Sequence, residues 1–128
     1  MLGITALYAG LIALLFMVLS FRVIGYRRSN QIGLGDAGDK SLLKRMRAQA
    51  NCAEYAPIGL ILLALVEAQG TPGWVVHGLG LMLLAGRLAH GYGFSASPPV
   101  MNLRVGGMLL TTGMIALAAI GLIAHALV

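Results

Sequence analysis

The fold is decided by a stretch that contains no charged residue, VGGMLLTTGMIALAAIGLIAHALV, at residues 105–128. Two further stretches of this kind run from residue 1 to residue 21 and from residue 68 to residue 86. The three are 24, 21 and 19 residues long, and about 20 apolar residues are needed for a helix to cross a bilayer. The pattern therefore predicts an all-α integral membrane protein.

A fourth apolar run, residues 55–66, lies between Glu54 and Glu67 and is too short to cross the bilayer alone. Its helix can span only if it extends back through Met46, which takes Asn51 and Glu54 into the membrane. We expect one domain, residues 1–128, that forms a four-transmembrane-helix bundle. The expected helices lie roughly at residues 2–25, 43–68, 73–94 and 101–127. No basic residue precedes the first apolar run, so we interpret it as a retained anchor rather than a signal peptide.

The composition excludes several other classes of protein. Charged residues make up 10% of the chain and apolar residues 59%, whereas a soluble domain has about 25% charged residues. A disordered chain needs the opposite balance. The single cysteine, Cys52, excludes an internal disulfide and any multi-cysteine metal site. We predict no metal.

The nine basic residues all lie near the first and third connections between the expected helices. Positive charge marks the cytoplasmic side of a membrane protein. The first and third loops are therefore predicted to be cytoplasmic, with both termini on the opposite side of a bacterial inner membrane or its equivalent. Topology and contact with anionic membrane lipid account for the net charge of +5, and we expect no nucleic-acid partner because no basic module stands outside the membrane.

The chemistry concentrates in KRMRAQANCAEYAP, residues 44–57. At 100° per residue, Arg47, Asn51 and Glu54 fall within about 60° of one another, with Asn51 placed to bridge the other two. Ionisable groups are costly inside a membrane and should face the bundle or a water-filled pocket. Either this is a polar network that fixes helix packing, or it is a site for a polar ligand that enters from the cytoplasm.

Two other features narrow the site. In the third expected helix, Arg87 and His90 share a face with Phe94, whereas His77 lies on another face and cannot join His90 on a metal. Arg45 and Gln49 point away from the face of Arg47, so they can line a site only if another subunit packs there.

The segment RAQANCAEYAP (47–57) closely resembles the second-helix signature of the MAPEG family, the membrane-associated proteins in eicosanoid and glutathione metabolism. The similarity is greatest to the leukotriene-C-forming and microsomal glutathione transferases of that family. Three further segments resemble family motifs in the same order, namely VIGYRR (23–28), GRLAH (86–90) and NLR (102–104). The resemblance covers nearly the whole chain.

The resemblance implies a homotrimer that binds glutathione, its co-substrate, between adjacent subunits near the cytoplasmic side. The positions that match glutathione-binding residues are Arg27, Arg28, Arg47, Gln49, Asn51, Glu54, Tyr55, Arg87 and His90. Gln49 would come from the neighbouring subunit, and Arg27 and Arg28 are alternatives for one contact. Arg104 matches the arginine that stabilises the thiolate, with Arg28 as the alternative. Phe94 stands where a tyrosine often stands, so its hydroxyl contact is lost unless Tyr92 supplies one.

The implied function is that of a membrane-embedded glutathione transferase, or a peroxidase, which joins the thiolate to a lipophilic small-molecule substrate. Arginines pair with the carboxylates of glutathione, Glu54 receives its ammonium, and a nearby cation favours the reactive thiolate. The alternative is a non-catalytic scaffold or lipid-binding protein of the same fold. A small proton-coupled exporter with Glu54 as the titrating carboxylate is disfavoured, because Arg47 on the same face would hold Glu54 ionised.

Overall fold

A computed structural model describes residues 1–128 as four helices and no strands. The helices are α1 (Gly3–Asn30), α2 (Lys40–Ala68), α3 (Gly73–Ser95) and α4 (Met101–Leu127). The prediction of an all-α bundle with four helices is confirmed, and the last two helices lie within one residue of their predicted bounds.

The first connection is shorter than the sequence suggested, because α1 continues to Asn30 and α2 begins at Lys40. Gln31 ends α1 in the left-handed conformation and donates its backbone N–H to the carbonyl of Arg27. Asp39 begins α2, since its side chain accepts hydrogen bonds from the backbone N–H groups of Ser41 and Leu42. The end of α1 and the first turn of α2 were predicted to lie in the loop, because the sequence there is polar and rich in glycine.

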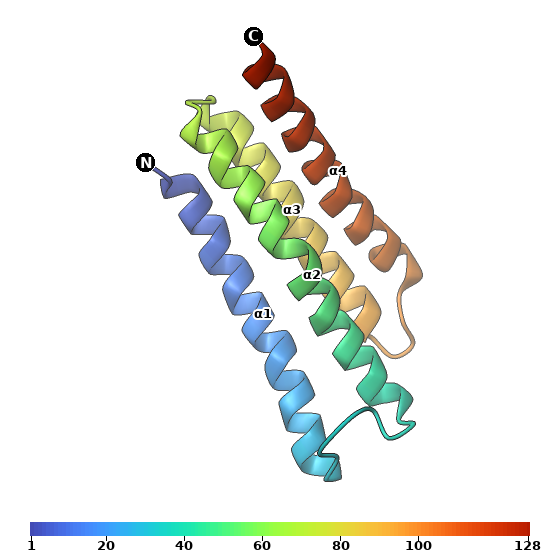
Figure 1. Ribbon diagram of the computed structural model, residues 1–128. Coiled ribbons are helices and arrows are strands. Elements are labelled where there is room, and N and C mark those ends of the chain that lie inside the picture. Colours follow the sequence, from blue (N-terminus) through green and yellow to red (C-terminus); the bar gives the residue numbers. More distant parts are fainter.

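The helices run alternately up and down, so the two termini lie at one end of the bundle (Figure 1). The α2–α3 turn lies at the same end, and the α1–α2 and α3–α4 connections lie at the other (Figure 1). The basic residues flank those last two connections. The predicted gathering of positive charge at one end of the molecule is therefore confirmed.

Three helices are long and apolar enough to cross a membrane, namely α1, α2 and α4. The remaining helix, α3, was also predicted to span the membrane. It has 23 residues, but its most apolar stretch is less apolar than those of the other three helices, because it carries His77, Arg87 and His90. Its interior position explains these residues, because α3 packs against all three other helices. Large apolar side chains such as Leu14, Leu109 and Ile120 are exposed on the outside of the bundle, as expected for contact with lipid.

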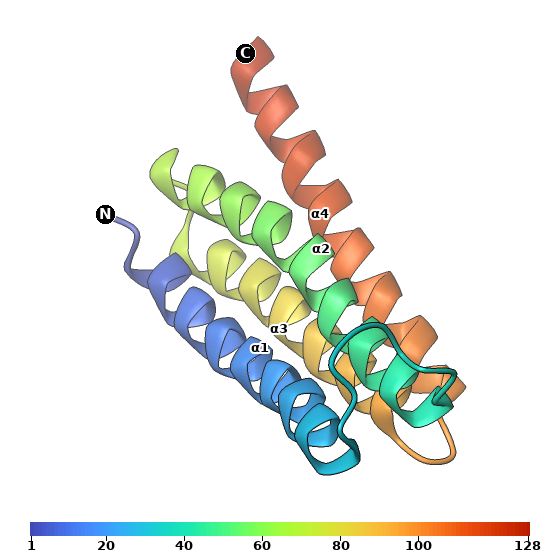
Figure 2. The same ribbon diagram turned by 60° about the horizontal axis from the view of Figure 1, so that its bottom comes forward.

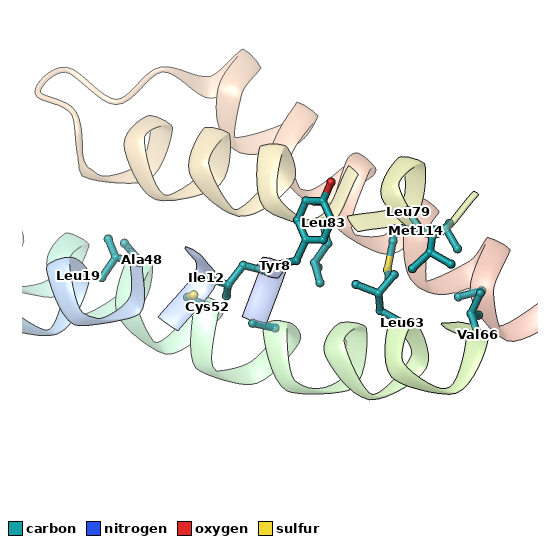
Figure 3. Close-up of a cluster of buried hydrophobic side chains, with 13 residues drawn as sticks. Tyr8, Ile12, Leu19, Ala48, Cys52, Leu63, Val66, Leu79, Leu83 and Met114 are labelled. Atoms are coloured by element: carbon teal, nitrogen blue, oxygen red, sulfur yellow. The ribbon is translucent and has the colours of Figure 1, made fainter. Parts of the chain in front are cut away.

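The two central helices, α2 and α3, separate α1 from α4, which do not touch each other (Figure 2). Side chains of all four helices build the core, including Tyr8, Leu63, Leu83 and Met114 (Figure 3). Tyr8 packs directly on Gly80, where a Cβ would overlap its ring.

A carboxylate of α2 closes the start of α1. The two side-chain oxygens of Glu67 accept hydrogen bonds from the backbone N–H groups of Ile4 and Thr5, each at 2.9 Å. The first N–H groups of a helix have no partner within the helix. Glu67 supplies that partner from another helix, a role that no local sequence pattern indicated.

Candidate functional site

Arg47 and Glu54 lie on one face of α2, as predicted, but they contact each other directly instead of through Asn51. A guanidinium nitrogen of Arg47 lies 3.7 Å from a carboxylate oxygen of Glu54, and both side chains are about half exposed (50% and 54%). The two side chains therefore reach each other across two turns. The expectation that Asn51 bridges them is wrong, because the Asn51 side chain is bound elsewhere.

Asn51 is held by Arg87 of α3. One Arg87 guanidinium nitrogen donates to the Asn51 side-chain oxygen at 2.6 Å and another donates to its backbone carbonyl at 3.1 Å. Arg87 is only 1% exposed, so its charge is surrounded by protein. The family resemblance implied that Arg87 is a direct ligand of glutathione, whereas in this structure it orients Asn51.

Tyr55 borders this pair, as its place on the helix suggested. The guanidinium carbon of Arg87 lies 5.9 Å from the centre of the Tyr55 ring, within the range of a cation–π contact. The ring thus covers the buried cation on the side of α2. Arg47 and Glu54 thus pair with each other on α2, while Asn51 and Tyr55 of the same helix both contact Arg87.

A separate groove of about 260 Å³ lies between His90 of α3 and the first half of α4. Its lining comprises His90, Met101, Arg104, Val105, Met108, Leu109 and Thr112. The Arg104 guanidinium carbon lies 3.9 Å from the centre of the Phe94 ring, so an aromatic face orients this cation. The groove therefore joins one charged group to an apolar wall.

His90 is 4% exposed and forms part of this groove. Its Nδ1 atom is buried and has no hydrogen-bond partner within the chain. The hydroxyl that Phe94 lacks is not replaced by Tyr92, which is 66% exposed and does not line the groove. Of the residues in this part of α3, His90 alone brings a polar side chain to the groove.

Glycines bring His90 close to α4. A Cβ on Gly107 would lie 2.5 Å from the backbone nitrogen of His90 and 2.6 Å from the carbonyl oxygen of Gly86. A Cβ on Gly93 would similarly lie 2.8 Å from the backbone nitrogen of Arg104. The backbones of α3 and α4 thus touch, as small residues allow in membrane helices, and this contact sets the distance between His90 and Arg104.

The other predicted residues lie on a second surface, formed by α1 and α2. The Gln49 side chain donates to the Ser20 hydroxyl at 3.4 Å. Arg27 donates to the carbonyl of Gly35 at 2.7 Å, which fixes the first connection. Arg28 is exposed and borders a shallow hollow beside Gln31 and Gly33. The predicted site residues therefore fall into two groups that do not meet within one protomer.

The first connection is held by an acid outside the apolar spans. The Tyr26 hydroxyl donates to Asp39 at 2.7 Å. This bond, together with the backbone N–H groups of Leu42 and Ser41, lowers the pKa of Asp39 below its ordinary value. The ionised form of Asp39 is therefore the one that holds the ends of α1 and α2 together.

Lys44 makes two hydrogen bonds to the α3–α4 connection that the sequence did not predict. Its ammonium donates to the carbonyl of Ala96 at 3.2 Å and to the hydroxyl of Ser97 at 2.8 Å. It thus ties the start of α2 to the connection that leads to Arg104. Its place in the basic stretch before Arg47 gave no sign of this partner. No three His, Cys, Asp or Glu side chains lie close enough together to hold a metal ion.

Comparison with known proteins gives two findings. The sequence profile of the MAPEG family matches residues 5–124. The inner membrane protein YecN of Escherichia coli strain K12 is 44% identical over 91 residues, which is 71% of this chain and 70% of that protein. The same protein from Escherichia coli O6:H1 gives the same values. The chain is thus similar to an inner membrane protein over most of its length.

Proposed function

Because this chain belongs to the MAPEG family, we propose that it is an integral membrane glutathione transferase. The reaction joins the glutathione thiolate to a lipophilic electrophile. The observation that carries the proposal is that neighbouring turns of α3 reach both regions: Arg87 binds Asn51 of the polar face of α2, and His90 lines the groove that holds Arg104. In this arrangement the residues that bind the charged glutathione lie next to the groove that accepts the lipophilic electrophile.

The charged surface suits the polar ends of glutathione. Arg47 is half exposed and free to turn one edge of its guanidinium toward a carboxylate. Glu54 then takes the ammonium of the ligand in place of part of its contact with Arg47. Asn51 and Tyr55 complete the surface, and Arg87 holds Asn51 in a fixed rotamer from behind.

Arg104 is proposed to act on the thiol electrostatically. An arginine keeps its proton at neutral pH and cannot serve as an ordinary base, but a nearby cation lowers the pKa of a thiol and increases the thiolate fraction. The apolar wall beside Arg104, formed by Met101, Val105 and Met108, accepts the electrophile. Arg28 remains the alternative partner for the thiolate.

The separation of the two surfaces supports a site shared by neighbouring subunits, and the assembly that we propose is a homotrimer. Gln49 and Arg28 lie on the α1–α2 side, whereas Glu54 and Arg104 lie on the side of α2, α3 and α4. One glutathione can touch both groups only if two protomers place these sides together. The proposed site therefore lies between subunits, with His90 contributing from the groove.

The proposed orientation follows from charge. The connections α1–α2 and α3–α4 carry the basic residues and are placed in the cytoplasm, with both termini on the opposite side of a bacterial inner membrane. The surface proposed to bind glutathione then opens toward the cytoplasm, from which glutathione enters the site.

The proposal is tested by titrating the detergent-purified protein with glutathione while recording the ultraviolet absorbance of the thiolate. A saturable thiolate signal at neutral pH, absent with S-methylglutathione, is the expected result. Saturable binding without a thiolate signal and without conjugation of any lipophilic electrophile would favour the second candidate, a non-catalytic scaffold or lipid-binding protein. A reaction with hydroperoxides instead of electrophiles would identify a peroxidase, and proton transport coupled to Glu54 would identify an exporter.

A further inference from the structure

Arg22 of α1 and Arg45 of α2 form a cationic pair without an ion-pair partner. The single ion pair of the molecule joins Arg47 to Glu54. Arg22 lies one turn before Tyr26 on α1, and Arg45 packs on the ring of that same Tyr26, so the two positive charges lie on the same side of the α1–α2 contact. Neither side chain donates a hydrogen bond to another residue, whereas Arg27, Lys44 and Arg87 all do.

The side chain of Arg45 is held in place by its neighbours. Its guanidinium carbon lies 4.8 Å from the centre of the Tyr26 ring, and its Nε atom is buried without a partner. Stacking on an aromatic face restricts the orientation of a guanidinium and leaves its terminal N–H groups pointing outward. Arg45 is therefore preorganised to donate to an acceptor that the chain does not provide.

The nearest acid does not fill this role. Asp39 contributes a favourable charge at Arg45, but one of its oxygens accepts from the Tyr26 hydroxyl and the other from the backbone of Ser41 and Leu42. Asp39 is thus committed to the start of α2. A pair of positive charges remains with only partial compensation.

The depth of the pair in the membrane indicates which anions reach it. Arg22 is the first charged residue after 21 uncharged ones. The part of α1 before Arg22, residues 3–21, spans about 28 Å, close to the thickness of the hydrocarbon core. Arg22 consequently lies at the level of the lipid headgroups, where phosphate is the abundant anion.

We propose that Arg22 and Arg45 together bind one phosphate group, supplied by the headgroup of an anionic membrane lipid. Two guanidinium groups present paired N–H donors that match phosphate oxygens. The anion also compensates the two like charges and accepts from the terminal N–H groups of Arg45. This site differs from diffuse attraction of a basic surface to anionic lipid, because it depends on two particular arginines.

The lipid site is separate from the proposed glutathione surface. Arg45 stacks on Tyr26 of α1, whereas Arg47 and Glu54 pair on another face of α2. Lipid binding at Arg22 and Arg45 therefore does not depend on whether the protein binds glutathione.

The test compares thermal unfolding of the full-length protein in detergent with added phosphatidylglycerol or phosphatidylcholine. The variants are Arg22→Gln and Arg45→Gln, with Lys40→Gln as the matched control, because Lys40 is exposed and its loss removes the same charge at the same end. Phosphatidylglycerol should stabilise the wild type and the Lys40 variant equally. It should stabilise Arg22→Gln and Arg45→Gln by less than half as much, with apparent affinity roughly tenfold weaker.

The same variants make a second, opposite expectation. With phosphatidylcholine alone, Arg22→Gln should melt at or above the wild-type temperature, because one of two neighbouring like charges is gone. A purely structural role of Arg22 would lower the melting temperature in both lipids. Arg45→Lys, which keeps the charge, distinguishes loss of the anion from loss of packing on Tyr26 and should retain part of the phosphatidylglycerol effect.

Three results would overturn the lipid site. Equal losses in Arg22→Gln, Arg45→Gln and Lys40→Gln would mean that only the total charge matters. Full stabilisation by inorganic phosphate at equal concentration would make a free anion the ligand rather than a lipid. Full stabilisation by glutathione, lost in the same two variants, would assign the two arginines to the glutathione surface.

Discussion

The interface between α3 and α4 differs in kind from the interface between α1 and α2. The first is a contact of backbone on backbone, since Gly86, Gly93 and Gly107 leave no room for a Cβ. The second is made by side chains, with the polar links Gln49 to Ser20 and Tyr26 to Asp39. An open apolar hollow of about 350 Å³ also lies along it beside Cys52.

The α3–α4 interface is therefore expected to be more rigid than the α1–α2 interface. His90 and Arg104 stand on helices whose separation is set by backbone atoms, and a site built on such rigid elements holds its geometry best. Arg28 and Gln49 stand on the interface that depends on side chains and on a connection. We infer that α3 and α4 position the chemistry, while α1 contributes adaptable binding contacts.

The largest expected effect comes from Gly107→Ala. The added Cβ would lie 2.5 Å from the backbone nitrogen of His90, so the helices must separate, and overpacking of this kind costs about 1–3 kcal/mol or more. The melting temperature in detergent and the affinity for glutathione should both fall. Gly25→Ala in α1 is the control, because nothing lies within 4 Å of its Cβ. Comparable losses for both glycines would abolish the distinction between the interfaces.

The next effect separates two carboxylates of α2. Glu54→Gln should weaken glutathione binding by about 1.5–3 kcal/mol, the value of a charge-assisted hydrogen bond, with little change in stability. Glu67→Gln should instead lower the melting temperature, because Glu67 closes the start of α1, while affinity for glutathione is retained. Calorimetric titration and thermal unfolding of both variants measure this. If both lose affinity equally, the site has been placed on the wrong part of α2.

The third effect concerns the thiol. Arg104→Ala should leave glutathione bound but raise the pKa of its thiol, and a pKa higher by one reduces the thiolate fraction about tenfold, equivalent to about 1.36 kcal/mol. The conjugation rate at neutral pH should fall and recover partly at higher pH, and Arg104→Lys should give an intermediate rate. Steady-state rates as a function of pH test this. Recovery at high pH in Arg28→Ala, but not in Arg104→Ala, would transfer the role to α1.

The smallest effect is a dependence of stability on acid at the α1–α2 end. The pKa of Asp39 is lowered in the folded protein, so its contribution is complete above its unfolded value of 3.8 and is lost as the pH falls through the folded value. In Asp39→Asn, the melting temperature should fall less steeply with decreasing pH in this range than it does in the wild type. No carboxylate occurs in α3 or α4. An unchanged acid profile in the variant would show that the Tyr26–Asp39 bond does not stabilise this interface.

The sequence was sufficient for the features that depend on neighbours along one helix. Charge-free runs located the four helices, and the 100° spacing placed Arg47 with Glu54 and turned Gln49 away from them. The ends of α1 and α2 were misplaced, because charged residues such as Arg27 and Lys40 continue a helix once it leaves the hydrocarbon.

Features that join different helices could not be read from the sequence. The bonds from Arg87 to Asn51, from Lys44 to Ser97 and from Ile4 to Glu67 depend on the relative heights of separate helices. Those heights follow from packing, and above all from the close approach at Gly107. A spacing rule for one helix carries no information about them.

The central claim is that one glutathione is held by the α2–α3–α4 surface of one protomer and the α1–α2 surface of the next. The most direct measurement counts glutathione sites in oligomers co-assembled from two variants, Arg47→Ala/Glu54→Gln and Arg28→Gln/Gln49→Ala. Each variant alone should bind little glutathione, whereas random co-assembly should restore about a quarter of the sites, since each restored interface pairs the two intact surfaces. No recovery in the mixture, or full binding by the Arg28/Gln49 variant alone, would contradict the claim.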